Sequence, residues 1–216
     1  MPEIICTTVY QFSELSDTAK EKARSWYREL GPYDDWWDAV YEDFERVCEI
    51  LGIRLKTRPV RLMGGGMRAK PCIWFSGFWS QGDGASFEGY LSHSKGAPAR
   101  IRDYAPTDAT LHGIADRLQA IQRRNFYQLA AEASHRGRYY HEYSMSVDVT
   151  RDSPTCQSPT EDAEETLTEA LRDLARWLYR QLQAEYDHLT SDEAIEEGII
   201  VNEYTFTEGG RRFGSS

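Results

Sequence analysis

Hydrophobic residues recur at three- and four-residue steps in two long stretches, the spacing that places side chains on one face of an α-helix. The first stretch covers residues 35–51 and ends at Gly52, and the second covers residues 161–186. Their apolar positions are Trp37, Val40, Tyr41, Phe44, Val47, Cys48 and Leu51 in the first, and Leu167, Leu171, Leu174, Leu178 and Leu182 in the second. Both patterns predict amphipathic helices with a charged outer face.

Three further helices are predicted from caps and shorter patterns. Either Ser13 or Ser16 can cap a helix that ends before Pro32, and another helix covers residues 108–124. Thr190 is followed three residues later by a glutamate, the spacing of a capping box, which predicts a short last helix.

Segments rich in β-branched and aromatic residues predict strands between these helices. Glycines near Gly82 and Gly137 indicate turns that join the strands as hairpins. Residues 59–71, which contain three consecutive glycines, predict a flexible loop or a hairpin tip. The predicted strands cover residues 4–10, 53–57, 72–79, 86–92, 127–134, 139–149 and 204–206.

The chain shows no internal repeat and no linker that would divide it. We therefore expect a single α+β domain over residues 1–208, with an antiparallel sheet of hairpins packed against several helices. Residues 209–216 are expected to form a flexible C-terminal tail.

Composition places the expected protein in a reducing, aqueous compartment. No run approaches the ~20 apolar residues of a membrane span, and the N-terminus does not resemble a signal peptide, so we expect a cytoplasmic protein without a membrane partner. The cysteines are too widely spaced for a closed zinc site and are expected to be core thiols. They are Cys6, Cys48, Cys72 and Cys156. We expect neither a metal nor another cofactor.

The formal net charge of −10 is unevenly distributed. Residues 50–82 contain six basic residues and no acid, whereas residues 157–208 contain fourteen acids and three arginines. An acidic protein repels nucleic acid at long range, so a basic protein surface is the partner that this charge favours.

The outer face of the first long helix is the leading candidate site. A row of carboxylates imitates a phosphate backbone and suits a basic groove on a partner, although such rows are also common as solvated surface. Two of the acids are also placed to cap the helix. The candidate partner-binding residues are Asp34, Asp35, Asp38, Glu42, Asp43, Glu45 and Glu49.

Two basic segments support nucleic-acid binding as an alternative. One is the acid-free segment, and the other is the hairpin of residues 135–141, where basic and aromatic residues mix. His135 and His141 lack a third ligand at metal-binding spacing. The candidate nucleic-acid contacts are Arg54, Lys56, Arg58, Arg61, Arg68, Lys70, Arg136 and Arg138.

A second alternative is an enzyme built around Asp83 and Glu88. These acids lie in the aromatic and glycine-rich segment 74–89, where they could act as an acid/base pair. The competing interpretation, which we favour, is an aromatic hairpin with Trp74 and Trp79 in the core. No catalytic sequence motif is present, so we assign no catalytic residue and lean towards a protein that is not an enzyme.

Several stretches resemble an uncharacterised family of phage and prophage proteins that are often labelled antitoxins of a toxin–antitoxin stability system. The stretches are residues 12–16, 73–89, 101–106, 123–129 and 190–194. The resemblance implies a mobile-element origin. By analogy with small acidic phage proteins that inhibit host defence, including anti-CRISPR proteins, we expect an inhibitor that binds a host defence or toxin protein directly.

Overall fold

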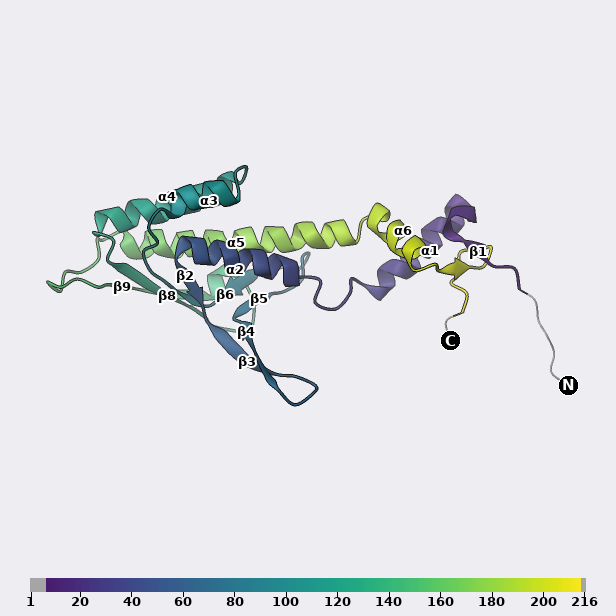
Figure 1. Cartoon of the computed structure of the whole chain (residues 1–216), viewed down its shortest axis with the longest axis horizontal. Coiled ribbons are helices and arrows are strands. Elements are labelled where there is room, and N and C mark those ends of the chain that lie inside the picture. The colour runs from purple at the N-terminus through teal and green to yellow at the C-terminus, as the bar shows by residue number, and fades with distance from the viewer. Residues whose placement is uncertain (1–6, 215–216) are drawn as a thin grey trace. The chain divides into compact units, whose positions relative to one another are not determined.

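The computed structural model describes residues 7–214, and its contacts group them into two compact units. The larger unit is residues 37–183, and the smaller unit combines residues 7–36 with residues 184–214. Six α-helices and antiparallel strand pairs confirm the predicted α+β class (Figure 1). The expected single domain over residues 1–208 stays a prediction.

The strands of the larger unit form three antiparallel sheets. One has four strands in the order β2–β7–β8–β9, and the pairs β3–β4 and β5–β6 form the other two. The strands are β2 (Ile53–Leu55), β3 (Thr57–Arg61), β4 (Met67–Pro71), β5 (Ile73–Phe75), β6 (Ala85–Phe87), β7 (Gly89–Leu91), β8 (Leu129–His135) and β9 (Met145–Arg151).

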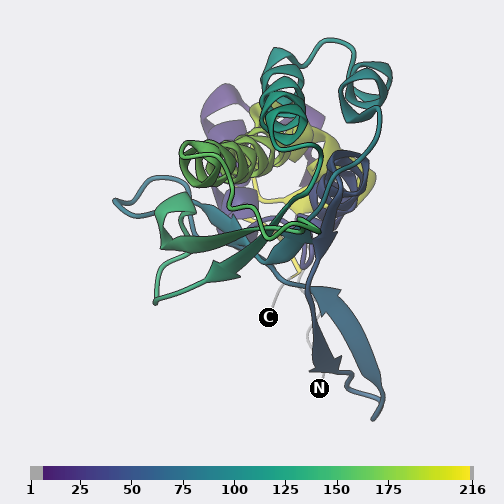
Figure 2. The same cartoon turned by 90° about the vertical axis from the view of Figure 1, so that its left-hand side faces the viewer.

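Helices cover one side of the four-stranded sheet, as Figures 1 and 2 show. Three of them were predicted; α3 was not, because eight residues are too few to display a helical period. The helices are α2 (Asp38–Leu51), α3 (Ala97–Tyr104), α4 (Ala109–Arg124) and α5 (Ala163–Leu189), with a 3₁₀ turn η2 at Glu142–Ser144.

The core of the larger unit lies under α5. Its five predicted leucines are at most 1% exposed, and each contributes about 1.5–3 kcal/mol by burial. On α2, Phe44 packs edge-on against Phe87 of β6, with ring centroids 5.3 Å apart. Small residues alternate inward along β8, where Ala131 and Ala133 are buried. They allow the sheet to approach the helical layer closely.

Polar side chains join α4 to α5 and to β8. Asp108 caps α4 by accepting from the amide of Leu111 at 2.9 Å, and its other oxygen accepts from Trp177 Nε1 at 2.6 Å. The buried Gln122 donates to the carbonyl of Leu129 and accepts from its amide. These bonds satisfy groups that would otherwise be costly to bury.

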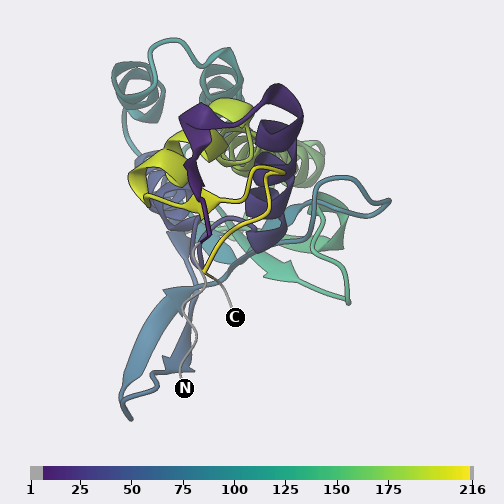
Figure 3. The ribbon, with the colours of Figure 1, turned by 90° about the vertical axis from the view of Figure 1, so that its right-hand side faces the viewer.

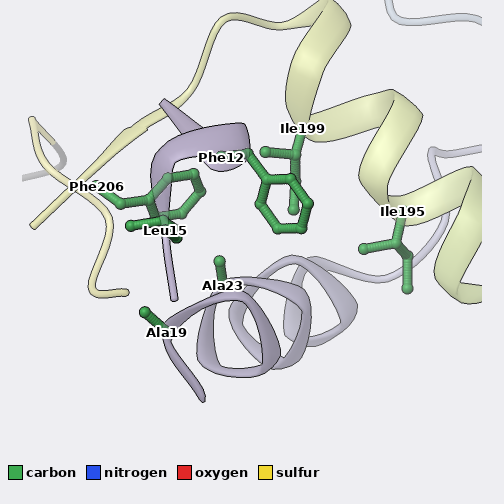
Figure 4. Packing of buried hydrophobic residues seen from close by; sticks show 7 residues of the cluster. All are labelled: Phe12, Leu15, Ala19, Ala23, Ile195, Ile199 and Phe206. Carbon is green, nitrogen blue, oxygen red and sulfur yellow. The ribbon is translucent and has the colours of Figure 1, made fainter. Parts of the chain in front are cut away.

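The two ends of the chain form the smaller unit (Figure 3). Strand β1 pairs antiparallel with β10, and α1 packs against α6 around a cluster that is shown in Figure 4. The elements are β1 (Tyr10–Gln11), the 3₁₀ turn η1 (Phe12–Glu14), α1 (Asp17–Leu30), α6 (Asp192–Val201) and β10 (Thr205–Phe206). The buried cluster consists of Phe12, Leu15, Ala19, Ala23, Ile195, Ile199 and Phe206.

The helix caps of the smaller unit are serines. Of the two predicted candidates, Ser13 and Ser16, the structure has Ser16 as the cap of α1, and its side chain accepts from the amide of Ala19. Ser191 accepts from the amide of Ala194, so the cap of α6 lies one residue after the predicted Thr190. The predicted first strand begins only at Tyr10, and residues 1–6 lie outside the described chain.

The flexible tail expected from residue 209 stays a prediction, but residues 209–213 contact other parts of the smaller unit. The amide of Phe213 donates to the carbonyl of Thr205 at 2.8 Å, and the Arg212 guanidinium lies 5.0 Å from the ring centroid of Trp26. Gly210 has φ +81°, and a Cβ there would lie 2.2 Å from the carbonyl oxygen of Ala19. These contacts join residues distant in sequence, so a local pattern could not show them. Residues 215–216 lie outside the described chain.

Of the two alternatives predicted for residues 59–71, the structure has the hairpin. Its tip is residues 62–66, where the amide of Leu62 donates to the carbonyl of Gly66 at 2.8 Å, and the flanking residues are strands. The expectation that Trp79 lies in the core is wrong. Trp79 is 72% exposed, because β5 ends at Phe75 and the strand alternation does not reach it. Of the cysteines, Cys48 and Cys72 are buried as predicted, Cys156 is exposed, and Cys6 lies outside the described residues.

Gly52 fixes the junction between α2 and β2, which generates our first prediction. Its φ is +86°, and an added Cβ would lie 2.4 Å from the carbonyl oxygen of Ser92. We expect Gly52→Ala to lower the free energy of unfolding by at least about 1–3 kcal/mol, measured by urea denaturation. The control is Gly113→Ala in α4, where nothing lies within 4 Å of the added Cβ. The control should be stabilised by about 0.5–1 kcal/mol. Equal effects of the two changes would contradict the requirement for glycine at position 52.

Candidate functional site

The acidic face of α2 follows from the burial of its opposite face. Phe44, Val47 and Leu51 are at most 3% exposed, so helical geometry turns four acids away from the core. We use the name α2 carboxylates for these four, which are all exposed. They are Asp38, Glu42, Glu45 and Glu49.

The register of the β3–β4 hairpin gathers basic side chains on one of its faces. Arg58 lies opposite Lys70, and Val60 lies opposite Arg68. Directly opposed strand residues share a face, and so do residues two apart, so all three basic residues project to the same side. Like charges placed opposite each other destabilise a hairpin unless other charges compensate them.

A hollow of about 370 Å³ brings these two charged surfaces together. Three of the α2 carboxylates and the three basic residues of the hairpin line this first hollow, so opposite charges face each other across it. Aromatic rings from α2 and β5 complete the lining. The residues concerned are Asp38, Glu42 and Glu45; Arg58, Arg68 and Lys70; and Trp37, Tyr41, Trp74 and Phe75.

A second hollow, of about 790 Å³, adjoins the first and shares Glu42, Glu45 and Arg68 with it. It extends along α2 to Glu49 and is closed on the other side by β2 and β4. Together the two hollows form a groove beside α2, which we name the α2 groove.

The surroundings of the groove disfavour the charged form of one carboxylate, that of Glu45. Glu45 is exposed, but partial burial of its carboxyl raises its pKa, the neighbouring Glu42 raises the pKa further, and Arg68 lowers it. Burial also raises the pKa of the Tyr41 phenol, against an opposing effect of Arg58. Glu45 is therefore less stable in its charged form than in water, even with a basic residue nearby.

Trp74 connects the groove to the loop at the end of the β8–β9 hairpin. The Arg58 guanidinium lies 5.8 Å from the ring centroid of Trp74. The Trp74 ring is nearly parallel to that of Tyr140, at 5.9 Å and 6°, and lies 5.6 Å from that of His135. The exposed Arg136 and Arg138 belong to this loop but do not line the groove.

The structure divides the predicted acidic site. The α2 carboxylates lie together, whereas Asp43 accepts a hydrogen bond from the hydroxyl of Tyr104 in α3. Asp34 and Asp35 belong to the smaller unit. The prediction that they cap the helix is wrong, because the N-cap residue is Trp37 and no side chain caps that end.

The predicted basic site is divided as well. Lys56 is paired with Glu132 at 2.7 Å, and Arg54 lies 5.3 Å from the ring centroid of Tyr90. Arg54 reaches the second hollow, but Arg61 lines neither hollow. The acid-free segment is therefore not one basic stripe, because the strand alternation and the ion pair distribute its charges.

Asp83 and Glu88 accept hydrogen bonds from the backbone. An oxygen of Asp83 accepts from the amide of Ser80 at 2.7 Å, and an oxygen of Glu88 accepts from the amide of His135 at 3.0 Å. Neither acid lines the α2 groove. These bonds support the structural interpretation of both acids.

The two histidines also have local partners. His135 Nδ1 lies 3.0 Å from Ser144 Oγ and 3.3 Å from Ser86 Oγ, while His141 Nδ1 is 3.0 Å from Glu142. Among residues 7–214, no three or more His, Cys, Asp or Glu side chains are grouped so that they could hold a metal ion.

Sequence reasoning missed the aromatic lining of the groove. Trp37 and Tyr41 were assigned to the apolar stripe and Trp74 to the core, but all three are only half-buried and line the first hollow. For Trp37 and Tyr41 the available signal was their place beside Asp38 and Glu42 in the sequence, at the edge of the apolar stripe.

The fold and the groove define an α+β protein with a mixed-charge, aromatic-lined surface groove. Residues 36–192 match the model of the family described as "Domain of unknown function (DUF8835)", so the chain belongs to this family. The match nearly coincides with the larger unit, and the α2 groove lies inside it. No curated protein and no solved structure matches the chain. In the part that the structure describes, no helix has the length and apolar character needed to cross a membrane.

The second prediction concerns Glu45. Its pKa in the folded protein is raised, so its contribution to stability is present below its ordinary pKa and is lost as the pH rises through the raised value. We expect Glu45→Gln to raise the free energy of unfolding at pH 7. The gain should be only about a few tenths of a kcal/mol, because solvent screens the exposed group. At pH 3 the difference should vanish.

The matched control is Glu49→Gln on the same helix, where Glu49 forms an ion pair with Arg46. This variant should gain no stability at pH 7. Urea titrations of both variants at the two pH values give the comparison, and a Glu45→Gln protein less stable than the wild type at pH 7 would contradict the prediction.

Proposed function

We propose that this chain is a binding protein that inhibits a partner protein by direct contact, with the α2 groove as its recognition surface. The observation that carries the proposal is that three of the α2 carboxylates line a hollow together with basic and aromatic residues. Aromatic side chains and arginine are enriched at the centres of protein recognition surfaces, and both line this hollow.

The mixed charge of the groove favours a polypeptide over a nucleic acid. A phosphate backbone that entered beside Arg58, Arg68 and Lys70 would meet three carboxylates on the other wall. A polypeptide carries both signs of charge and can match both walls. The basic loop at Arg136 and Arg138 supports the alternative, because its aromatic neighbours give it the composition of a nucleic-acid contact.

The target class of the proposal comes from the sequence resemblance. A phage or prophage origin makes a host defence or toxin protein with a basic surface the expected target, in the cytoplasm of the host. An anti-CRISPR-like or antitoxin-like inhibitor is the form that this proposal takes.

The third prediction tests the acidic wall. Neutralising the three carboxylates of the first hollow, by Asp38→Asn, Glu42→Gln and Glu45→Gln together, should leave the circular dichroism spectrum unchanged. The same variant should lose capture of the target from a host lysate and slow its association at least about tenfold, because charge complementarity mainly sets the association rate. Neutral residues are preferable to lysines, which would face the basic wall.

The control removes the same charge elsewhere in the larger unit, by Glu161→Gln, Glu164→Gln and Glu165→Gln. These acids are exposed and line neither hollow. The control should capture the target as the wild type does. A folded groove variant with full inhibitory activity would exclude the α2 groove as the recognition surface.

The fourth prediction separates the proposal from the nucleic-acid alternative. With a net charge of −10, the protein should bind random duplex DNA more weakly than about 100 µM near physiological salt. Fluorescence anisotropy with a labelled duplex measures this. A low-micromolar dissociation constant that is lost in Arg136→Ala/Arg138→Ala would favour nucleic-acid binding instead.

A further inference from the structure

The β3–β4 hairpin has two outer edges, and no other described strand pairs with either. An unpaired edge presents backbone donors and acceptors to which another chain can add a strand. Which of the two edges is competent depends on which residues turn their backbone groups outward.

The hydrogen bonds at the two ends of the hairpin set this pattern. The amide of Leu62 donates to the carbonyl of Gly66 at 2.8 Å, and the amide of Cys72 donates to the carbonyl of Lys56 at 2.7 Å. Hydrogen-bonded and non-hydrogen-bonded pairs alternate in an antiparallel ladder. Counting inward from both ends, Ala69 of β4 and its opposite residue, Pro59, occupy a non-hydrogen-bonded pair whose backbone groups point outward.

The two edges differ in where a proline interrupts the outward donors. On β3 the outward residues are Thr57, Pro59 and Arg61, and the central one, Pro59, has no N–H to donate. On β4 they are Met67, Ala69 and Pro71, so the proline stands at the end of the strand. Met67 and Ala69 are exposed and offer two successive outward N–H groups, which makes the β4 edge the better one for an added strand.

The β4 edge borders the α2 groove. Ala69 and Arg68 line the second hollow from β4, and Glu42, Glu45 and Glu49 line it from α2. A strand added to β4 would run beside these carboxylates, which favour basic side chains on that strand. Backbone pairing supplies affinity in this mode of recognition, and alternate side chains supply specificity.

We propose that the β4 edge binds an extended segment of the partner protein as an additional strand, with arginine or lysine side chains directed to the α2 carboxylates. This inference rests on the proposed function and names the form of the bound partner. It requires the backbone of β4, whereas the proposed function requires only the α2 groove.

The probe is a blocked hexapeptide of alternating valine and arginine, titrated into the full chain by calorimetry and by two-dimensional NMR. Ala69→Pro removes the outward N–H at a position that donates no hairpin hydrogen bond, so the hairpin should persist. We expect the peptide to bind the wild type and Ala69→Val equally, and to bind Ala69→Pro at least about tenfold more weakly.

Two modified peptides test the wild-type protein without any mutation. N-methylation of alternate residues removes the pairing donors from one edge of the peptide, so one of the two possible methylated sets should lose binding. A hexapeptide of alternating valine and glutamate should bind at least about tenfold more weakly than the arginine peptide. Shifted amide resonances should include those of Met67 and Ala69.

Absence of binding to the wild type, equal binding to Ala69→Pro, or full binding of both methylated peptides would overturn the edge pairing. Equal binding of the glutamate peptide would overturn the basic preference. The proposed function can fail separately: target capture that survives neutralisation of the α2 carboxylates refutes it. If the variant with neutralised carboxylates loses target capture, but the peptide binds Ala69→Pro as tightly as the wild type, the edge pairing alone is refuted.

Discussion

The burial of the apolar face of α5 is the constraint on which the larger unit depends. Five leucines on one side of this helix are almost fully buried and cover the four-stranded sheet. The alanines of β8 allow close approach, and Asp108 joins α4 to Trp177 of α5. Once this layer is in place, α2 can bury Phe44 and Val47 in only one orientation, and that orientation sends its carboxylates outward.

The charges of the groove depend on one another across the two elements. The hairpin register places Arg58 opposite Lys70, and three of the α2 carboxylates line the hollow beside them. The compensation is incomplete, since burial and Glu42 still raise the pKa of Glu45. The charged form of Glu45 is therefore held in the groove at a cost that the nearby Arg68 only partly offsets.

The division of the chain into two units agrees with the family match. Residues 36–192 belong to the family domain and contain the whole α2 groove, whereas the smaller unit is built mostly from the two chain ends outside the match. That unit has its own buried cluster and its own cap residues, Ser16 and Ser191. The proposed recognition surface therefore needs only residues of the family domain.

The sequence by itself determined the elements whose information is local. The three- and four-residue spacing of leucines in α5 and of apolar residues in α2 predicted both helices, because helical period is set by the backbone. The carboxylates of α2 could be placed outside its apolar stripe for the same reason. Tertiary structure decided what those carboxylates face, since Glu45 and Arg68 line the same hollow and Arg68 lowers the pKa of Glu45 although the two residues are distant in sequence. Three residues from each of the two charge patterns, which the sequence presented as competing sites, form the two walls of the first hollow because the hairpin register and the packing of α2 bring them together.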